Sequence, residues 1–152
     1  MNASKQAAKY FRDVHFGGNW TSVNLKDTLS DVTWEQAQKK VGDFNTIATL
    51  AVHVKYFVPV VLKVLKGGPL EGKDALSFDH SFIQSQADWE SFLNEWWDEA
   101  EQVAKLVEEL PEEKLFGPFV DPKYGDYYRQ IHGMIEHAHY HLGQISLIKK
   151  MI

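Results

Sequence analysis

The sequence has no cysteine among its 152 residues, and this absence excludes several kinds of site. Disulfide bonds, thiolate metal ligands and a cysteine nucleophile are all ruled out. Basic clusters are absent too, and 16 Lys and Arg against 21 Asp and Glu give a net charge of −5. The chain therefore lacks the electrostatic signature of a nucleic-acid-binding protein, and we expect no nucleic-acid partner.

Targeting and membrane signals are also missing. The first five residues lack the apolar core of a signal peptide, and no apolar run is expected to be long enough to span a bilayer. We therefore expect a cytoplasmic protein without membrane contacts. There is no Ser-His-Asp order, no glycine-rich phosphate loop and no His-Glu-x-x-His motif, so the common hydrolase and nucleotide-binding signatures are excluded.

What the chain does contain is a large apolar and aromatic fraction, 44% and 13%, which predicts a folded core in one domain over residues 1–152. Apolar residues recur at intervals of three and four in long segments. The predicted long helices cover residues 2–15, 45–66, 85–110 and 127–152, with shorter helical pieces at 20–29 and 33–42. Strand signals are weak outside residues 45–66, so the sequence predicts an all-α, antiparallel four-helix bundle.

Several local signals set the expected ends of these helices. Asn2 is the predicted N-cap of the first, and Thr33–Gln36 and Ser85–Asp88 have the spacing of a capping box. The second long helix is rich in β-branched residues, which favour a strand, but its period and length favour a helix. Pro59 lies inside it and is expected to kink or split it. Residues 67–84 and 111–125 are expected to be loops.

Three histidines are predicted to face the core. His137 and His141 lie one turn apart on the last helix, and His53 lies on the apolar face of the second. Burying an imidazole without a partner costs on the order of 1–3 kcal/mol, so a shared divalent cation is favoured over three separate core histidines. Three neutral nitrogens leave a coordination position open, as in catalytic sites, and they suit Zn, Ni, Fe or Mn equally.

Other polar residues on or near these helices are given simpler roles. His132 and His139 are predicted to face solvent, and His80 to lie in a loop, where the mouth of the site is a less favoured position. Glu136 points about 100° away from His137 and is not expected to be a ligand or a base. Gln144 is expected to hydrogen-bond a metal ligand or a neighbouring helix.

Two adjacent tryptophans, Trp96 and Trp97, cannot both lie on one apolar stripe. The one left over is expected either at the surface of a homodimer or at a shielded edge of the monomer. The sequence leaves both alternatives open.

The histidine-bearing segments are similar to motifs of a known family. The run His137-Ala-His-Tyr-His141-Leu-Gly-Gln-Ile, preceded by Ile135-Glu136, resembles the closing motif of the DinB/YfiT-like proteins. Asn45-Thr-Ile-Ala-Thr-Leu-Ala-Val-His53 resembles the family's second-helix segment. Softer similarities at Gly17–Trp20 and at Thr33–Ala37 extend the resemblance over nearly the whole chain. The family pattern implies a four-helix bundle in which these three histidines bind a divalent metal.

The resemblance implies less about the reaction, because characterised members include thiol-dependent transferases and isomerases that use bacillithiol or mycothiol. The leading hypothesis is a metal-dependent enzyme, a thiol S-transferase with a low-molecular-weight thiol as one substrate. The alternatives are a metal- or ligand-binding stress-response protein without turnover, and a metal-dependent hydrolase. No inward carboxylate is expected beside the histidines, which weakens the hydrolase hypothesis. Catalytic residues other than the metal ligands are not identified.

Overall fold

The computed structural model describes residues 2–152 and contains four long helices. They are α1 (Ala3–Phe16), α4 (Ile47–Leu65), α5 (Gln86–Glu108) and α7 (Tyr127–Lys149). Shorter elements are α2 (Leu25–Leu29), α3 (Trp34–Ala37), α6 (Glu112–Leu115) and the 3-10 helices η1 (Asp74–Leu76) and η2 (Pro122–Tyr124). In the described residues the only β-type pairing is an isolated bridge between Pro118 and Asp126, so the all-α prediction is confirmed.

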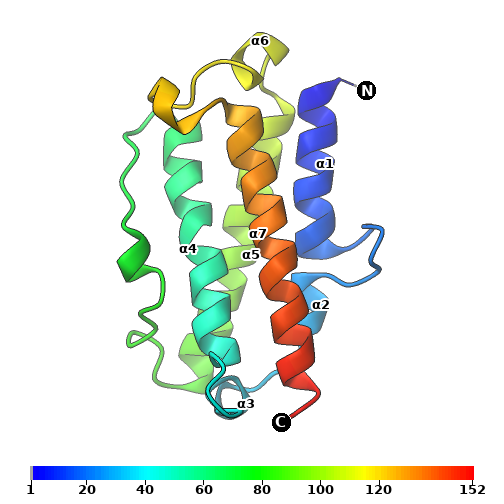
Figure 1. The fold of residues 1–152 in the computed structure, drawn as a ribbon, viewed down its shortest axis with the longest axis vertical. Coiled ribbons are helices and arrows are strands. Elements are labelled where there is room, and N and C mark those ends of the chain that lie inside the picture. Colours follow the sequence, from blue (N-terminus) through cyan, green and yellow to red (C-terminus); the bar gives the residue numbers. More distant parts are fainter. Residues whose placement is uncertain (1) are drawn as a thin grey trace.

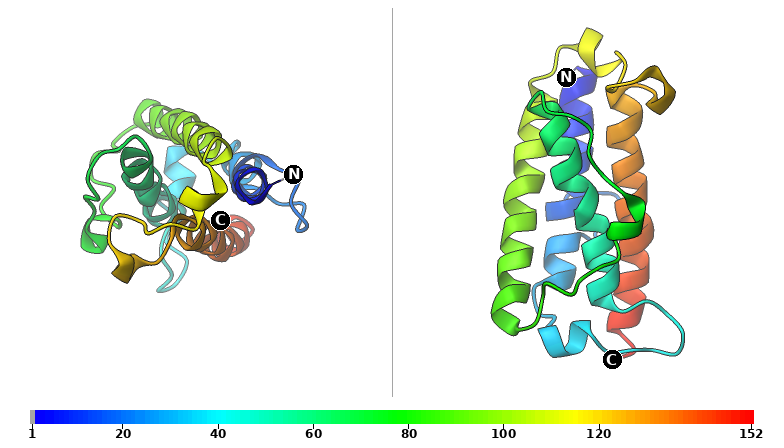
Figure 2. Two further views of the ribbon diagram at one scale, coloured as in Figure 1. Left: turned by 90° about the horizontal axis from the view of Figure 1, so that it is seen from above. Right: turned by 90° about the vertical axis from the view of Figure 1, so that its left-hand side faces the viewer.

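The long helices form a bundle in which α1 contacts α5 and α7, and α4 contacts the same two helices (Figures 1 and 2). The chain runs down α1, up α4, up α5 and down α7 in the orientation of Figure 1. The expected antiparallel packing therefore holds for the pairs α1–α5 and α4–α7. The pairs α4–α5 and α1–α7 are parallel, which the sequence did not indicate.

Because α4 and α5 are parallel, residues 66–85 must return along the whole length of the bundle to start α5 (Figure 1). We call this segment the crossover. It is mostly irregular, as predicted, and contains the short helix η1. Lys73 N–H donates to the Tyr56 hydroxyl at 2.8 Å, which ties the crossover to α4 halfway along. Figure 2 shows it lying against the outer side of the bundle.

Side-chain caps mark where the long helices begin. Asn2 caps α1 and Ser85 caps α5, as predicted, and Thr46 and Asp126 cap α4 and α7. The reciprocal capping box predicted at Thr33 and Gln36 is present. The side chain of Asp88 accepts from the Gln84 N–H, so the second predicted box is not reciprocal.

The shorter elements differ from the predictions. The helical piece expected from residue 20 starts only at Leu25, because the Asn24 side chain caps it and Ser22 has a positive φ of 55°. The helix after Thr33 ends at Ala37 rather than near residue 41. Residues 111–125, expected to be a loop, contain α6 and η2.

Helix α4 corrects two expectations. It runs without a break through Pro59, so the predicted split is wrong, and a bend there stays a prediction. With 19 residues and a mean hydropathy of 1.6, it is also long enough and apolar enough to cross a membrane, contrary to the expectation that no run would be. However, 61% of that stretch is buried in the bundle, as in the core helix of a globular domain.

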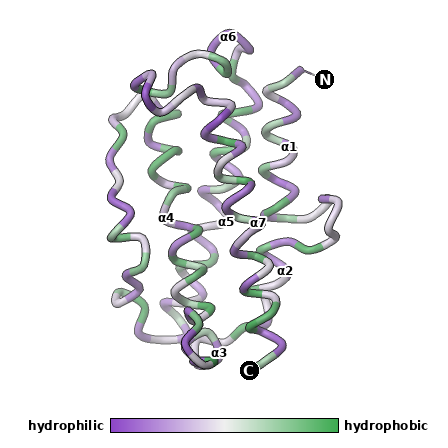
Figure 3. The backbone as a smooth tube through the Cα atoms, viewed as in Figure 1, coloured by the Kyte–Doolittle hydropathy of each residue, from purple (hydrophilic) through white to green (hydrophobic). Residues whose placement is uncertain are grey.

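The bundle core is built from the predicted apolar stripes, and Figure 3 shows hydrophobic and hydrophilic residues alternating along α1 and α7. Trp96 is fully buried, whereas Trp97 is half-buried and packs on the rings of Trp96 and Phe16. These contacts shield one side of Trp97 within the monomer, which agrees with the second alternative. The homodimer stays a prediction.

His15 is a buried core residue in the last turn of α1. Its Nδ1 hydrogen-bonds the Phe11 carbonyl at 2.8 Å, and its ring is 1% exposed. Burial lowers the pKa of His15 from 6.5 to about 4. The imidazole is therefore neutral in the folded protein at pH 7 and resists protonation on acidification.

This burial predicts an acid sensitivity. Between pH 6.5 and 4 the unfolded chain binds a proton at His15 that the folded chain does not, so the stability present above pH 6.5 falls as the pH drops. His15→Phe should reduce the loss of unfolding free energy between pH 7 and 4.5 by about 2–3 kcal/mol, measured by urea unfolding at both values. An equal loss in variant and wild type would contradict this assignment.

Candidate metal centre

The side chains of His53, His137 and His141 come together between α4 and α7, halfway along the bundle. Each offers one nitrogen, and the three nitrogens lie within 4.8 Å of one another. The Nε2 atoms of His53 and His137 are 2.9 Å apart. Residues 84 positions apart are thus brought into contact, and the predicted convergence of the three histidines is confirmed.

Hydrogen bonds fix which nitrogen of His53 faces the cluster. The Ser77 hydroxyl donates its one proton to the Asp74 carbonyl at 2.6 Å, so the hydroxyl oxygen accepts from His53 Nδ1–H at 2.7 Å. A neutral His53 protonated at Nδ1 has its lone pair on Nε2. That lone pair is directed toward His137.

His141 is oriented in the same way by the residue one turn further along α7. Its Nδ1 lies 2.7 Å from Gln144 Oε1, an oxygen that can only accept, so Nδ1 carries the proton. In its neutral form, this ring has its lone pair on Nε2. Gln144 thus bonds one of the three clustered histidines, and such a contact is the kind of support that orients histidines in metal sites.

Burial keeps two of the imidazoles neutral. Burial lowers the pKa of His53, and the nearby His141 lowers it further. Burial and then the neighbouring His141 and His53 lower the pKa of His137 to about 4. The opposing influence on both is the Asp74 carboxylate. At pH 7 these rings are thus in the neutral form that a metal ion requires.

Aromatic side chains enclose His53. Phe78, from the crossover, stacks on its ring with centroids 4.1 Å apart and an interplanar angle of 13°. Phe57, one turn along α4, meets the rings of His53 and His137 edge-on at 5.6 and 5.4 Å. These apolar walls shield the imidazoles from water and hold the His53 ring against rotation.

Two pockets adjoin the cluster along the α4–α7 interface. One, of about 380 Å³, is formed by residues of both helices and of η1. Its lining is His53, Phe57, Val61, Asp74, Gln130, Gly133, Met134 and His137. We call it the histidine pocket. Because it is lined by two of the three histidines, it is the natural place for a ligand that reaches the cluster.

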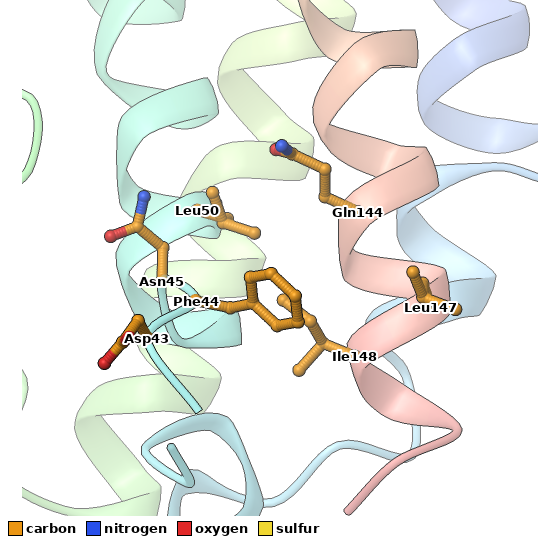
Figure 4. Close-up of a pocket in the computed structure, with 7 residues that line it drawn as sticks. All are labelled: Asp43, Phe44, Asn45, Leu50, Gln144, Leu147 and Ile148. Carbon is orange, nitrogen blue, oxygen red and sulfur yellow. The ribbon is translucent and has the colours of Figure 1, made fainter. Parts of the chain in front are cut away.

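The second pocket, of about 360 Å³, lies between the start of α4 and the end of α7 (Figure 4). Phe44, Leu50, Leu147 and Ile148 make it mainly apolar, and Asp43 and Asn45 lie on its α4 side. Figure 4 shows the Gln144 amide at its upper end. Gln144 also hydrogen-bonds His141, so its side chain lies between this pocket and the cluster.

The remaining predicted residues lie outside the cluster. His132 and His139 are half-buried and line a groove against Tyr10 and Trp20, so the prediction that they face solvent is only partly right. His80 packs edge-on against Trp34, away from the three histidines. Glu136 is exposed and pairs with Arg129, in agreement with its predicted lack of a role.

The predicted orientation of His137 and His141 around the axis of α7 also needs a correction. The centre of its buried stripe consists of Ile131, Ile135, Ala138, Leu142 and Ile145, whereas His137 and His141 are only partly buried. The two histidines lie on the flank of the stripe that faces α4. His132 and His139 lie on the opposite flank, which faces α1. The flank position gives a metal ligand access to a pocket that a central core position would not have.

Sequence reasoning missed the contribution of the crossover. Ser77, Phe78 and Asp74 all come from a segment that was expected to be an irregular loop. In particular, an inward carboxylate was not expected, yet Asp74 lines the pocket with His53 and His137. Ser77 is the buried polar residue of this segment, and its burial is what reveals that the segment contributes to the site. The burial of one serine in a polar stretch cannot be read from the sequence.

The donor set fits a divalent cation. It consists of three nitrogen atoms, with the Nδ1 protons of two rings already directed away from the cluster. Nitrogens that share an ion at about 2.1 Å lie no more than about 4.2 Å apart, so closing the widest gap requires a side-chain shift of under about 1 Å. These residues could therefore hold Zn, Ni, Fe or Mn, and they do not select among them.

Comparison with protein families gives one match. Residues 19–145 match the DinB superfamily, which covers more than half of the chain and both histidine-bearing segments. Searches among curated proteins and among solved structures gave no match.

The geometry predicts which histidines carry metal affinity. His53→Ala should keep the helical content and lower zinc affinity at least about 100-fold, because two imidazoles remain where three converged. His139→Ala is the matched control, since its ring lies on the other flank of the same helix. Zinc titration by calorimetry, with circular dichroism of each variant, tests this. Loss of affinity in the control alone would show that the cluster is not the metal site.

The supporting hydrogen bonds give a second prediction. Ser77→Ala and Gln144→Leu each remove the acceptor that holds a ring in its metal-binding orientation. Each should weaken zinc binding about 10- to 100-fold without removing a ligand. Ser81→Ala, in the exposed part of the crossover, should leave the affinity unchanged. Wild-type affinity in both variants would show that these contacts do not orient the ligands.

Proposed function

We propose that this chain, which belongs to the DinB superfamily, is a divalent-metal-dependent enzyme. The proposed enzyme transfers a low-molecular-weight thiol to an electrophile. The observation that carries the proposal is the three-histidine cluster with an adjoining pocket. His53, His137 and His141 would hold the ion and leave part of its coordination shell to substrate.

A thiol suits this site because of its charge. Neutral imidazoles leave the full double positive charge of a divalent ion uncompensated, and that charge favours an anionic ligand. When bound, the ion would hold a thiol in its deprotonated form at neutral pH, as metal ions do for cysteine side chains. The chain has no cysteine of its own, so the reacting sulfur must come from a substrate.

The residues of the chain would then orient the substrates and exclude water. Phe57 and Phe78 shield the cluster, and the histidine pocket receives the thiol. The apolar pocket beyond Gln144 offers room for the electrophile. Two pockets on either side of one cluster match a reaction with two substrates.

A metal-dependent hydrolase is the second candidate, and Asp74 is the observation that favours it. A carboxylate beside a metal site can accept a proton from water, and no residue was predicted for that role from the sequence. The thiol transferase is preferred because Asp74 is exposed and has no partner among the described residues that would aim it at the cluster. A cytoplasmic location and the absence of nucleic-acid and membrane partners stay predictions.

Turnover provides the test. Protein loaded separately with Zn, Ni, Fe(II) or Mn is mixed with cysteamine and 1-chloro-2,4-dinitrobenzene, and the coloured thioether is followed. The sulfur replaces chloride on the ring, and the thiol proton passes to the buffer. We expect a metal-dependent rate that falls at least about 100-fold in His53→Ala and is retained in His139→Ala.

Other outcomes are equally decisive. Equal rates with and without metal would contradict the proposed enzyme. Metal-dependent hydrolysis of ester substrates, without thiol transfer, would favour the second candidate. Tight thiol binding with no turnover of any electrophile would show the non-catalytic binding protein that the sequence left open.

A further inference from the structure

Asp74 is the one carboxylate in the lining of the histidine pocket, and its charge is not compensated there. In residues 2–152 no Lys, Arg or His forms an ion pair with it, and no N–H or O–H donates to its side chain. No Lys or Arg side chain lines this pocket either. The pocket therefore presents a metal site at one end and a single free negative charge at its rim.

The position of Asp74 is fixed through its backbone. Its carbonyl accepts from both the hydroxyl and the N–H of Ser77, at 2.6 and 2.9 Å, and Ser77 in turn binds His53. The preceding residue, Lys73, is tied to Tyr56 of α4. The backbone of Asp74 is thus held near the cluster by contacts that do not involve its carboxylate. A substitution that changes only its charge leaves these contacts in place.

The rest of the lining limits what the ligand can be. Phe57, Val61 and Met134 provide apolar walls, and the Gln130 side chain is committed to the Tyr124 carbonyl. Apart from a metal ion at the histidines, an anionic group beside Asp74 would meet no compensating cation in this pocket. A group that carries a positive charge would be attracted to it, and the short distance across one pocket favours a small molecule with both groups.

We propose that Asp74 recognises an ammonium group on the thiol substrate, so that the site selects aminothiols over neutral and anionic thiols. This inference rests on the proposed function, because it assigns the sulfur to the metal end of the pocket. Asp74 is then a specificity-determining residue, not a metal ligand or a base. The thiol loses its proton to solvent when its sulfur binds, and the ammonium group keeps its charge.

The test uses three small thiols of similar length and different charge with the cobalt(II)-loaded protein. Cysteamine is cationic, 2-mercaptoethanol is neutral and 3-mercaptopropionate is anionic. Binding is followed at pH 7 by the sulfur-to-cobalt charge-transfer absorption, at saturating cobalt. In Asp74→Asn, cysteamine should bind about three- to fivefold more weakly, 2-mercaptoethanol should change less than about twofold, and 3-mercaptopropionate should bind more tightly.

Comparing each thiol between wild type and variant cancels the different thiol acidities. The cysteamine effect should also shrink between low salt and about 0.5 M salt, because Asp74 is exposed and its charge is screened. Asp79→Asn is the matched control, an exposed carboxylate on the same crossover that lies outside the pocket, and it should change none of the three affinities.

Contrary results are distinguishable from failure of the proposed function. An equal weakening of all three thiols in Asp74→Asn would overturn the inference and indicate a role in thiol deprotonation. A drop of more than about tenfold in cobalt affinity would overturn it by making Asp74 a metal ligand. If cobalt binds at the three histidines and no thiol gives the charge-transfer band, the proposed function itself fails.

Discussion

The hydrogen bond between His53 Nδ1 and the Ser77 hydroxyl is the contact on which the site depends. A buried imidazole has two nitrogens, and leaving one unpaired costs on the order of 1–3 kcal/mol. The hydrogen bond from Nδ1 to the crossover fixes the tautomer and directs Nε2 toward α7. There the Nε2 atom of His137 lies 2.9 Å from Nε2 of His53. The same hydroxyl donates to the Asp74 carbonyl, so one serine of the crossover links the His53 ring to the backbone of Asp74.

Bundle topology explains why a loop segment has this role. Parallel α4 and α5 require a connection as long as the bundle, and residues 66–85 provide it. Such a segment loses conformational entropy when it is ordered, and contacts to the bundle must offset that loss. The bonds from Lys73 to Tyr56 and from His53 to Ser77, with the stacking of Phe78, are such contacts. Two of the residues that anchor the crossover, Ser77 and Phe78, thus also contact a histidine of the cluster.

Helical periodicity made the four helices and their caps predictable, because each long helix has its own apolar stripe and Asn2 and Ser85 follow local capping chemistry. It also brought out His53, His137 and His141, since side chains on a helix face repeat with a known angle. Helix direction was not predictable, because an apolar stripe packs equally well against a parallel neighbour. The roles of Ser77, Phe78 and Asp74 depend on that direction, so the polar residues of the site outside the helices could not be found.

In the proposed function, such a site would couple metal binding to substrate recognition. Three imidazole ligands would leave the charge of an ion to be balanced by the substrate, which is why we propose an anionic sulfur there. Asp74 then supplies the one negative charge that the protein itself places in the pocket. Both His53 and Asp74 are positioned by Ser77, so a shift of the crossover would move the carboxylate and release the ligand ring together. Substrate that bridges the two would in turn hold the crossover in place, because it would add a contact between the cluster and the segment that supports it.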